Sequence, residues 1–569
     1  MNDTFRQALI TGCESLTAWA DLLDRINVFP VADGDTGRNL VISLSPLHHT
    51  ERNIHNLTQA LLFCARGNSG NIASAFFQAF ILADTPEKLP EAIRQGRDLA
   101  WQAVPDPRPG TMLTFFDVLV ACSQKPWSAS TFPGHLSRLG TAVRETVNQQ
   151  PKLREAGVVD AGALGMYLFF GEFIKTYLGF TLSLPSTMEI FGDLVHLSPF
   201  FQEQPEKGFC VDAVLKTHVD PQRTEEILAT LGESIVVSRD ENCLKVHFHT
   251  QNRDAARKIL APCGEVVKWT EDDLYAQITG FNREQQRNAI HIMTDAAGSL
   301  TREEAKSRDI TLLDSYINID AQSLPETYLS PGVLYDAMRS GVRVSTSQAS
   351  VFERHQRYVS VLECYERVLY LCVGSVYTGN YKVVMDWKKT HDLQDRLTVI
   401  DTGAASGRLA VLVMAVAAIA QKASRPEDVI DFTIDAIDHA EEYIFLDRLE
   451  YLAAGGRLSK TKAFFGDVLH MKPVVTPMAD GAQKAGLCRN RKDQEALALK
   501  MLAKSLDTNS YALILLEYSD NLSQIEAFSN IIKTRYPKAQ IIVHPLSLTS
   551  GVHMGPGTWA IAFLPKFRA

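Results

Sequence analysis

Two aspartates separated by one residue, Asp33 and Asp35, lie in the stretch NVFPVADGDTGRN at residues 27–39. A proline and two glycines keep this stretch out of a regular helix, so both carboxylates can point at one small volume. Such a volume suits Mg²⁺, which prefers a few carboxylate oxygens together with waters and substrate phosphates. The amide oxygen of Asn27 is a weaker third candidate ligand. The alternative is an Asx turn in a surface loop, which uses the same residue types.

Three other loops of the N-terminal third are rich in glycine and hydroxyl groups. A loop that opens a helix directs its backbone N–H groups at an anion, although a glycine loop that only caps a helix is commonplace. Their combination with the aspartate turn indicates a phosphate site. No Walker sequence GxxxxGK[ST] is present, so phosphate binding must rest on metals and backbone donors. The candidate residues are Asn68, Ser69 and Gly70 in ARGNSGN, Thr111 and Met112 in PGTMLT, and Asp160 and Gly162 in GVVDAGALG.

A second group of candidate metal ligands comprises Cys210, His247 and His249. On a strand, residues two apart project to the same face, so the two imidazoles point the same way. With one thiolate they offer three ligands of the kind that Zn²⁺ prefers. The alternative is that they are ordinary half-exposed strand residues.

In the C-terminal half, hydroxyl-rich loops follow apolar strands. Ligands of open α/β sheets bind at the carboxyl ends of strands, so such loops can hold a carboxylate or a phosphate. ST turns and helix N-caps use the same residue types and are the alternative. The candidate residues are Thr346 and Ser347 in residues 344–348 and Ser375 and Thr378 in residues 374–380, with further loops at 294–295 and 401–403.

The elements that must position these residues divide the chain into three predicted domains. Residues 1–194 carry helical periodicity, as at 5–23, 56–64, 72–82 and 115–122. Residues 195–285 alternate short strands at 234–237 and 244–249 with helices at 223–231 and 253–260, which indicates a small α+β domain. Residues 286–569 predict an α/β domain with a mostly parallel sheet, with strands at 290–293, 367–373, 397–400, 512–516, 540–543 and 559–564.

Composition limits the function classes. The 569 residues are 46% hydrophobic and 22% charged, which is typical of several folded domains. A formal charge of −9 gives no basic stripe, so we expect no nucleic-acid partner. The N-terminus has no secretory signal pattern, and the apolar run at 409–420 is too short to span a bilayer. Nine cysteines without a CxxC pair fit reduced thiols and a cytoplasmic location.

The order NVFPVADGDTGRNL, ARGNSGN, PGTMLT, GVVDAGALG resembles the nucleotide-binding domain of the dihydroxyacetone kinase family (DhaL, or DAK type), most closely its branch in bacterial fatty acid kinases. The resemblance implies an α-helical barrel with ATP at one end and Mg²⁺ on Asp33 and Asp35. It places Asn68 and Ser69 at the phosphates, and Thr111, Met112 and the loop 160–162 around base and ribose.

Two further resemblances follow along the chain. GFCVDAVL and KVHFHT resemble the middle domain of fatty acid kinases, where Cys210, His247 and His249 are the implied metal site, with a structural or partner-facing role. TSQ, LEYLAAGGR, KPV and HMGPG resemble the DegV family of fatty-acid-binding proteins, which implies an apolar tunnel for an acyl chain between two α/β lobes. The implied carboxylate ligands and charge-neutralising residues are Thr346, Ser347 and Thr378, His553 beside them, and Arg457 with Arg489 or Arg491.

This sequence departs from the DegV pattern at several positions. Ala349 replaces the usual proline after TSQ, and Asn380 replaces the second hydroxyl of the SGT loop. Tyr377, Met554 and Trp559 are bulky, so we expect a narrowed or redirected tunnel.

The resulting hypothesis is a single-chain fatty acid kinase that converts ATP and a fatty acid into an acyl phosphate and ADP, with Asp33, Asp35, Arg457 and His553 as catalytic residues. The fatty-acid carboxylate attacks directly, without a side-chain nucleophile. Expected partners are the fatty acid, an acyltransferase that uses the acyl phosphate, transient contact with a membrane, and a second copy in a homodimer. The alternatives are a small polyol or ketone kinase and an inactive lipid-binding regulator.

Overall fold

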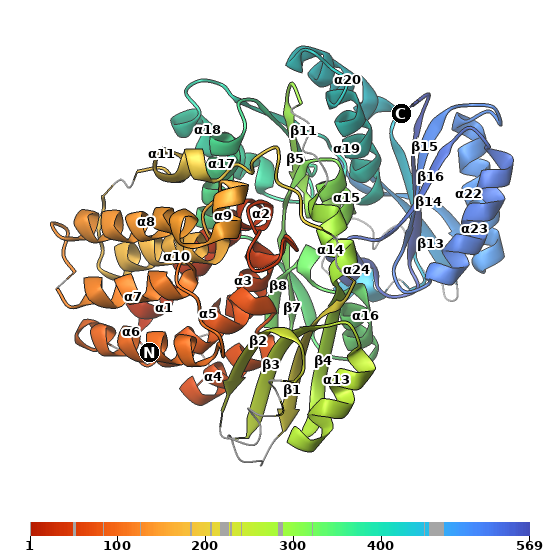
Figure 1. Cartoon of the computed structure of the whole chain (residues 1–569). Helices are drawn as coiled ribbons and strands as arrows, with labels where there is room; N and C mark the ends of the chain where they lie inside the picture. Colours follow the sequence, from red (N-terminus) through yellow and green to blue (C-terminus); the bar gives the residue numbers. More distant parts are fainter. Residues whose placement is uncertain are drawn as a thin grey trace. The chain divides into compact units, whose positions relative to one another are not determined.

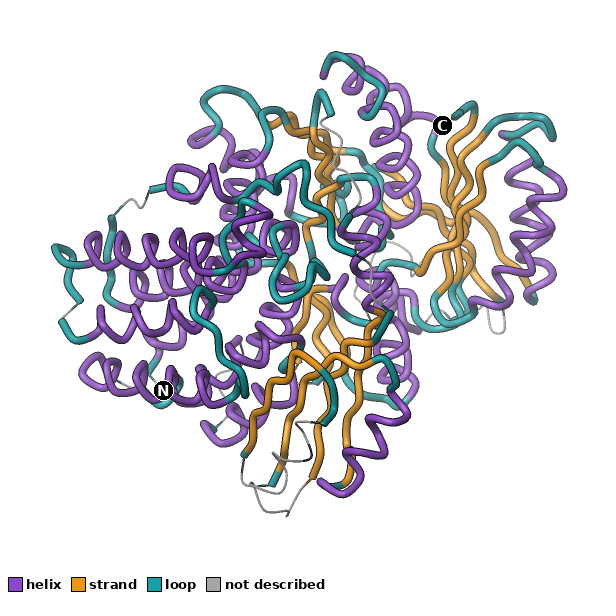
Figure 2. Tube along the Cα trace, viewed as in Figure 1, coloured by secondary structure: helices purple, strands orange, loops and turns teal. Residues whose placement is uncertain are grey.

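The computed structural model describes residues 2–48, 53–83, 85–125, 127–182, 185–204, 207–216, 227, 230–240, 242–282, 288–320, 322–448, 450–454 and 471–568. The chain forms two compact units, Met1–Glu284 and Gln285–Ala569. The first contains a helical bundle and one antiparallel sheet, and the second contains three sheets with covering helices (Figures 1 and 2). The helical, α+β and α/β fold classes predicted along the chain are therefore confirmed.

The helical bundle of the first unit begins at the N-terminus. The long apolar helix α10 has most of its length buried by its neighbours, α1 and α7 among them, so it forms the centre of the bundle. The helices are α1 (Asp3–Ala18), α2 (Ala20–Arg25), α3 (Thr36–Leu44), α4 (Ile54–Cys64), α5 (Gly67–Phe80), α6 (Leu89–Gln102), α7 (Met112–Ser123), α8 (Phe132–Gln149), α9 (Pro151–Ala156), α10 (Ala161–Tyr177) and α11 (Thr187–Phe191).

Phenylalanine rings fill the interior of this bundle. Neighbouring rings lie 4.1 to 6.1 Å apart between centroids, in stacked and edge-on arrangements. Such pairs add to the stabilisation from apolar burial. A cavity of about 10 Å³ at the edge of this aromatic core has room for about one water molecule. The core rings are those of Phe5, Phe76, Phe77, Phe80, Phe115, Phe116, Phe169, Phe170 and Phe173.

The sheet of the first unit is antiparallel throughout, in the order β2-β3-β1-β4. Its strands are β1 (Phe209–Lys216), β2 (Glu233–Arg239), β3 (Cys243–Thr250) and β4 (Glu265–Asp273), followed by α14 (Leu274–Phe281). One face packs on α13 (Arg253–Leu260), where the sequence predicts a helix. Side chains from β1–β3 also pack against α4, α5 and the residues that directly follow α6. Both faces are covered, which is why β3 is buried almost along its whole length. The helix predicted at 223–231 lies mostly outside the described residues.

The second unit contains one parallel sheet and two others. The four-stranded sheet β11-β10-β5-β6 is parallel. The three-stranded sheet β8-β7-β9 is antiparallel. The strands are β5 (His291–Asp295), β6 (Ile310–Leu313), β7 (Ser315–Ile319), β8 (Gln322–Pro325), β9 (Val344–Gln348), β10 (Val368–Cys372) and β11 (Leu397–Asp401).

The third sheet corrects the prediction of a mostly parallel sheet. Its order is β14-β13-β12-β17-β15-β16, and only β15 and β16 run parallel. A tight turn at Ala479–Asp480 folds β13 and β14 into a hairpin, and β17 returns between β12 and β15 in the opposite direction. The strands are β12 (Glu441–Phe445), β13 (Lys472–Met478), β14 (Gly481–Cys488), β15 (Ala512–Tyr518), β16 (Gln540–Pro545) and β17 (Trp559–Pro565).

Helix α19 (Ser406–Ala420) lies between the four-stranded and the six-stranded sheets of this unit (Figure 1). Nearly every residue of α19 is buried, as expected for the apolar run at 409–420. Among the described helices, none is long and apolar enough to cross a membrane. The other helices of the unit are α15 (Arg302–Ser307), α16 (Pro331–Arg339), α17 (Val351–Cys364), α18 (Asn380–His391), α20 (Pro426–His439), α21 (Glu450–Ala454), α22 (Arg491–Ser505), α23 (Leu522–Arg535) and α24 (Leu548–Met554).

Candidate functional site

The aspartate turn joins α2 to α3. Gly34 adopts a φ of +66°, which lets the chain reverse between Asp33 and Asp35. Asn27 donates its amide N–H to Asp33 Oδ1, and Gln277 from α14 donates to Asp35 Oδ2 at 3.1 Å. Asn27 therefore orients Asp33 through its amide nitrogen. Burial and then the neighbouring Asp35 raise the pKa of Asp33, and burial also raises the pKa of Asp35. A bound cation would offset both effects.

Four helix-opening loops meet at one end of the bundle. Thr36 Oγ1 on α3 lies 3.3 Å from Ser69 Oγ on α5. A Cβ atom added to Gly162 on α10 would lie 3.4 Å from Ser69 Oγ and 2.7 Å from the terminal methyl of Met112 on α7. The loops that the sequence analysis singled out therefore come together, although 126 positions separate the first from the last of these residues.

Two of the predicted nucleotide contacts act as helix caps in this structure. Thr111 Oγ1 accepts the N–H of Leu113 at 3.3 Å, and Asp160 Oδ1 accepts the N–H of Ala163 at 2.7 Å. These bonds are the local N-cap interactions that such residues commonly make. Asp160 is buried, which raises its pKa to about 6.

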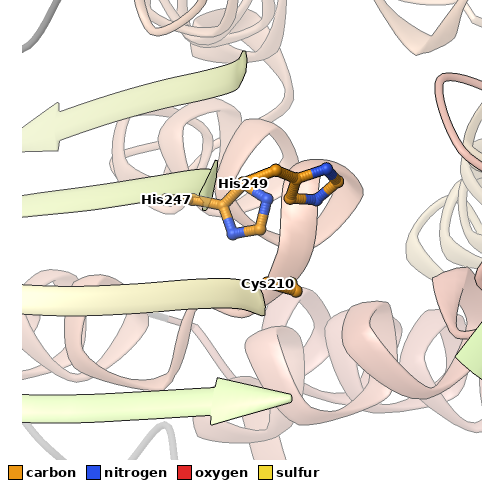
Figure 3. Close-up of side chains that lie close together, drawn as sticks. All are labelled: Cys210, His247 and His249. Carbon is orange, nitrogen blue, oxygen red and sulfur yellow. The ribbon is translucent and has the colours of Figure 1, made fainter. Parts of the chain in front are cut away.

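The cysteine and both histidines lie together. The ligand atoms of Cys210, His247 and His249 are all within 4.8 Å of one another (Figure 3). Cys210 on β1 is paired directly with His249 on β3, which explains the convergence. All three are buried, with His247 at 0% exposure, so the half-exposed alternative is wrong. Nε2 of His247 has no hydrogen-bond partner in the described part of the chain. This donor set fits Zn²⁺ and leaves a fourth position for another ligand.

One pocket contains both groups of candidate ligands. Its lining includes the aspartate turn, the first turn of α5 and the cysteine–histidine cluster. The resemblance implied a structural or partner-facing role for the cluster, whereas the structure places it beside the carboxylates. The pocket residues that bear on function are Asn27, Asp33, Asp35, Thr36, Asn39, Asn68, Ser69, Cys210, His247 and His249.

Two residues next to this pocket, Asp212 and Lys245, were not predicted from the sequence. Asp212 Oδ1 is 3.2 Å from Lys245 Nζ and 3.4 Å from His247 Nδ1. Asp212 and Lys245 are both buried. A signal was available, because Asp212 follows Cys210 by two positions and so shares its face of the strand. Nothing in the sequence shows that this face meets α5.

In the second unit, residues 344–348, predicted as a hydroxyl loop, form strand β9 instead, and this strand adjoins the end of α24. Thr346 Oγ1 lies 3.2 Å from His553 Nε2. A Cβ atom added to Gly379 would lie 3.9 Å from Gln348 Oε1, so the loop after β10 also adjoins this point. Asn318 on β7 donates its amide N–H to Ser347 Oγ at 3.2 Å and was missed by the sequence analysis.

The loop after β10 is held by local and buried bonds. Thr378 Oγ1 accepts the N–H of Asn380 at 3.0 Å, and the N–H of Ser375 donates to Asp401 at 3.0 Å. Asn380 is buried and donates its amide N–H to Asp295 Oδ1 at 2.8 Å. The residue that replaces the second hydroxyl of the DegV pattern is thus turned into the core.

The arginines predicted to neutralise phosphate charge lie in different surroundings. Arg491 stacks on Trp559 with 4.2 Å between guanidinium and ring, pairs with Glu495 at 3.0 Å, and lines a polar cleft of about 860 Å³. The side chain of Arg489 is exposed. Arg457 lies outside the described residues.

The structure also describes the surroundings of the three bulky residues that we expected to narrow or redirect a tunnel. Trp559 is fully buried and stacks on Phe445 at 4.1 Å, so it belongs to the core that packs under α22 and α23. Tyr377 donates its hydroxyl to the Met478 carbonyl at 2.8 Å. Met554 packs against a small apolar cluster formed by residues of β12, β13, β17 and α21.

Glu326 holds the N-terminus of α24, the helix that carries His553. Its carboxylate accepts the N–H of Thr549 at 3.0 Å and the Thr549 hydroxyl at 3.1 Å. Burial raises the pKa of Glu326 from 4.5 to about 7. Between these values the folded state keeps a proton that the unfolded state releases, so stability falls as pH rises from about 4.5 to 7.

We therefore expect Glu326→Gln to stabilise the second unit above pH 7, by about 3 kcal/mol at most, because its amide oxygen can accept the Thr549 N–H, its NH₂ group can donate to the Thr549 hydroxyl, and it carries no charge. Urea unfolding at pH 5, 6, 7 and 8 measures this difference against the wild type. Glu526→Gln on the exposed face of α23 is the control, with no change at any pH. A Glu326→Gln variant less stable than the wild type at pH 8 contradicts the prediction.

Three family models match successive parts of the chain. The DAK2 domain matches residues 30–175, the middle domain of FakA-like fatty acid kinases matches 206–280, and the DegV family of uncharacterised proteins matches 289–566. The first two matches support a kinase family for the first unit. One chain therefore combines a DAK2 domain, a fatty-acid-kinase-type middle domain and a DegV domain.

Relatives and solved structures cover parts of the chain. An uncharacterized protein of Staphylococcus saprophyticus is 29% identical over 54% of this chain, and the protein YloV of Bacillus subtilis is 28% identical over 50%. The chain spans 60% and 58% of their lengths. Among solved structures, a DegV family protein of Thermus thermophilus described as binding fatty acid is 22% identical, with 49% of this chain and 99% of that chain covered and a TM-score of 0.45. DegV of Bacillus subtilis, described as a fatty acid binding protein, is 18% identical, with 50% and 100% covered and a TM-score of 0.45.

Proposed function

We propose that this chain is a fatty acid kinase, in which the DegV domain holds a fatty acid and the DAK2 and middle domains transfer the γ-phosphoryl group of ATP to its carboxylate. The observation that carries the proposal is the pocket that combines Asp33, Asp35 and the α5 turn with the cysteine–histidine cluster. It occurs in a chain that also carries a DegV domain. Fusion of carrier and kinase gives an effective concentration on the order of millimolar for a short linker.

The pocket offers separate donor sets for two kinds of metal. Asp33 and Asp35 would hold Mg²⁺, which neutralises phosphate charge when bound. Cys210, His247 and His249 would hold Zn²⁺, which supplies a Lewis acid with one open position. Asn68 and Ser69, at the N-terminus of α5, would contact the phosphates of ATP.

The chain's own residues position the reactants. Thr346, Ser347 and His553 would hold the fatty-acid carboxylate through hydrogen bonds. That carboxylate is ionised at neutral pH, so no general base is required. A carboxylate oxygen forms the new bond to the γ-phosphorus while the bond from γ-phosphorus to the bridging oxygen breaks and ADP leaves with those electrons. Orientation and charge stabilisation are then the main contributions of the protein.

ATP-dependent formation of an acyl phosphate tests the proposal. Purified full-length protein is incubated with ATP, Mg²⁺ and oleate or palmitate, and hydroxylamine traps the product as a hydroxamate. We expect ADP and hydroxamate in equal amounts, and neither without fatty acid. ADP formed with dihydroxyacetone but not with fatty acid would instead support a polyol or ketone kinase. Fatty-acid binding without any turnover would support a lipid-binding regulator.

Metal analysis tests the zinc assignment separately. We expect about one zinc per purified chain, and a loss of most of it in Cys210→Ser and in His247→Ala, because each variant leaves two ligands where three converge. Cys64→Ser, which changes a thiol at the end of α4 outside the cluster, keeps its zinc. Wild-type protein free of zinc after expression in zinc-supplemented medium contradicts the assignment.

A further inference from the structure

A buried carboxylate lies where the sheet of the first unit meets the first turn of α5. Asp212 on β1 is 4% exposed. Its Oδ2 accepts the N–H of Gly67 at 3.0 Å, and its Oδ1 accepts the amide N–H of Asn71 at 2.9 Å. Lys245 Nζ on β3 lies 3.2 Å from Oδ1. One side chain therefore holds helix α5 and strand β3 at once.

The same carboxylate faces a candidate zinc ligand. Asp212 is paired with His247 across β1 and β3, and Oδ1 lies 3.4 Å from His247 Nδ1. Neither ring nitrogen of His247 has a hydrogen-bond partner among the described residues, so the 3.4 Å approach of Asp212 to Nδ1 is a close contact, and the ring belongs to the cluster with Cys210 and His249. A carboxylate that accepts the N–H of one nitrogen of a metal-bound imidazole fixes the tautomer and the ring orientation that present the other nitrogen to the metal, and Asp212 is the carboxylate within reach of Nδ1 here.

On its other side, Asp212 controls the start of α5. Gly67 adopts a φ of +61°, and a Cβ atom on it would lie 2.1 Å from Asn39 Nδ2, so the turn fits closely against α3. The N–H bonded by Asp212 belongs to this residue. The next two residues, Asn68 and Ser69, line the pocket. A shift of Asp212 would move the metal ligand and the phosphate-binding turn together.

We propose that Asp212 is a positioning residue that links occupancy of the metal centre to nucleotide affinity. The inference rests on the proposed function only in assigning zinc to the cluster and ATP to the α5 turn. Zinc on Cys210, His247 and His249 fixes His247 and hence Asp212, which in turn fixes the N–H of Gly67. Because the two binding free energies are linked, bound nucleotide raises the affinity of the protein for zinc by the same factor as bound zinc raises its affinity for the nucleotide.

The test uses full-length protein and measures binding alone. Zinc affinity is obtained by competition with a chromophoric chelator, and the affinity for ADP with Mg²⁺ is measured on zinc-free and zinc-loaded protein. We expect Asp212→Asn to weaken zinc about 10- to 100-fold. We expect bound zinc to raise the affinity for ADP at least about 5-fold in the wild type and to have no such effect in Asp212→Asn. Cobalt substitution provides the spectroscopic readout: the thiolate-to-cobalt band keeps its position in Asp212→Asn and titrates at higher cobalt concentration.

Two further variants separate positioning from misfolding. The double variant Asp212→Asn with Lys245→Met also removes the lysine charge that the first change leaves unpaired. We expect this variant to bind zinc as weakly as Asp212→Asn does and to have the circular dichroism spectrum of the wild type. Asp254→Asn on the exposed side of α13 leaves both affinities unchanged. The proposal is overturned by wild-type zinc affinity in Asp212→Asn or in the double variant, or by equal ADP affinity with and without zinc in the wild type. Because no turnover is measured, absence of kinase activity with this linkage intact would contradict the proposed function alone.

Discussion

Replacing Asp33 and Asp35 together with asparagine is expected to lower the turnover number for acyl phosphate formation at least about 10³-fold. Asparagine keeps the size of both side chains but removes the two negative charges that would bind Mg²⁺. Phosphoryl transfer depends on positioning and on charge neutralisation by the metal, so little activity should remain. Hydroxamate formation at saturating ATP and fatty acid measures the effect, and calorimetric titration with ATP shows whether Mg²⁺ still tightens binding.

The fold should survive this change, because the two buried carboxylates repel each other and asparagine can still accept hydrogen bonds from Asn27 and Gln277. Fatty-acid binding by the second unit should equal that of the wild type. Asp3→Asn on the exposed first turn of α1 is the matched control and keeps full activity. Acyl phosphate formed at the wild-type rate by the double variant would show that the metal is held elsewhere.

Thr346→Ala combined with His553→Ala is expected to raise the dissociation constant for a fatty acid about 10²-fold. The two side chains lie 3.2 Å apart and belong to segments that meet in the folded unit. Each hydrogen bond to a charged group contributes about 1.5–3 kcal/mol, so the loss of both is large even if water replaces part of it. Displacement of a fluorescent fatty acid by oleate measures the change.

The methyl ester of the same acid shows whether the effect belongs to the carboxylate. The ester cannot present a charged head, so the double variant and the wild type should bind it with similar affinity. His439→Ala with Thr534→Ala changes the same residue types on exposed helix faces and should leave oleate binding unchanged. An equal loss for acid and ester would place the carboxylate site elsewhere.

Local patterns of the sequence were informative where the chemistry is local. Asp33 and Asp35 are two positions apart, and so are His247 and His249, so turn composition and strand alternation suffice to place each pair on one side. The helix caps at Thr111 and Asp160 use residue types that also suit a ligand, and only the bonds of the folded chain separate the two uses.

Other features depend on contacts between distant segments. Asp212 meets Gly67 across 145 positions, and Asn318 meets Ser347 only because β7 pairs with β9. Strands β13 and β14 were missed because several of their residues are polar, small or half-exposed, which gives no clear apolar run. The sequence also could not predict that β17 runs antiparallel to its neighbours, because a strand buried on both faces has the same apolar pattern in parallel and antiparallel sheets.

The filled aromatic interior of the helical bundle bears on where the lipid tail can reside. Its rings are buried and lie in mutual contact, so their side chains occupy the interior of the bundle. To accommodate an alkyl chain, the bundle would have to expel several of its largest core side chains. If the chain has the proposed activity, the first unit should meet only the polar head of the fatty acid and should accept acids of different tail length, and the second unit should set the selectivity for the tail.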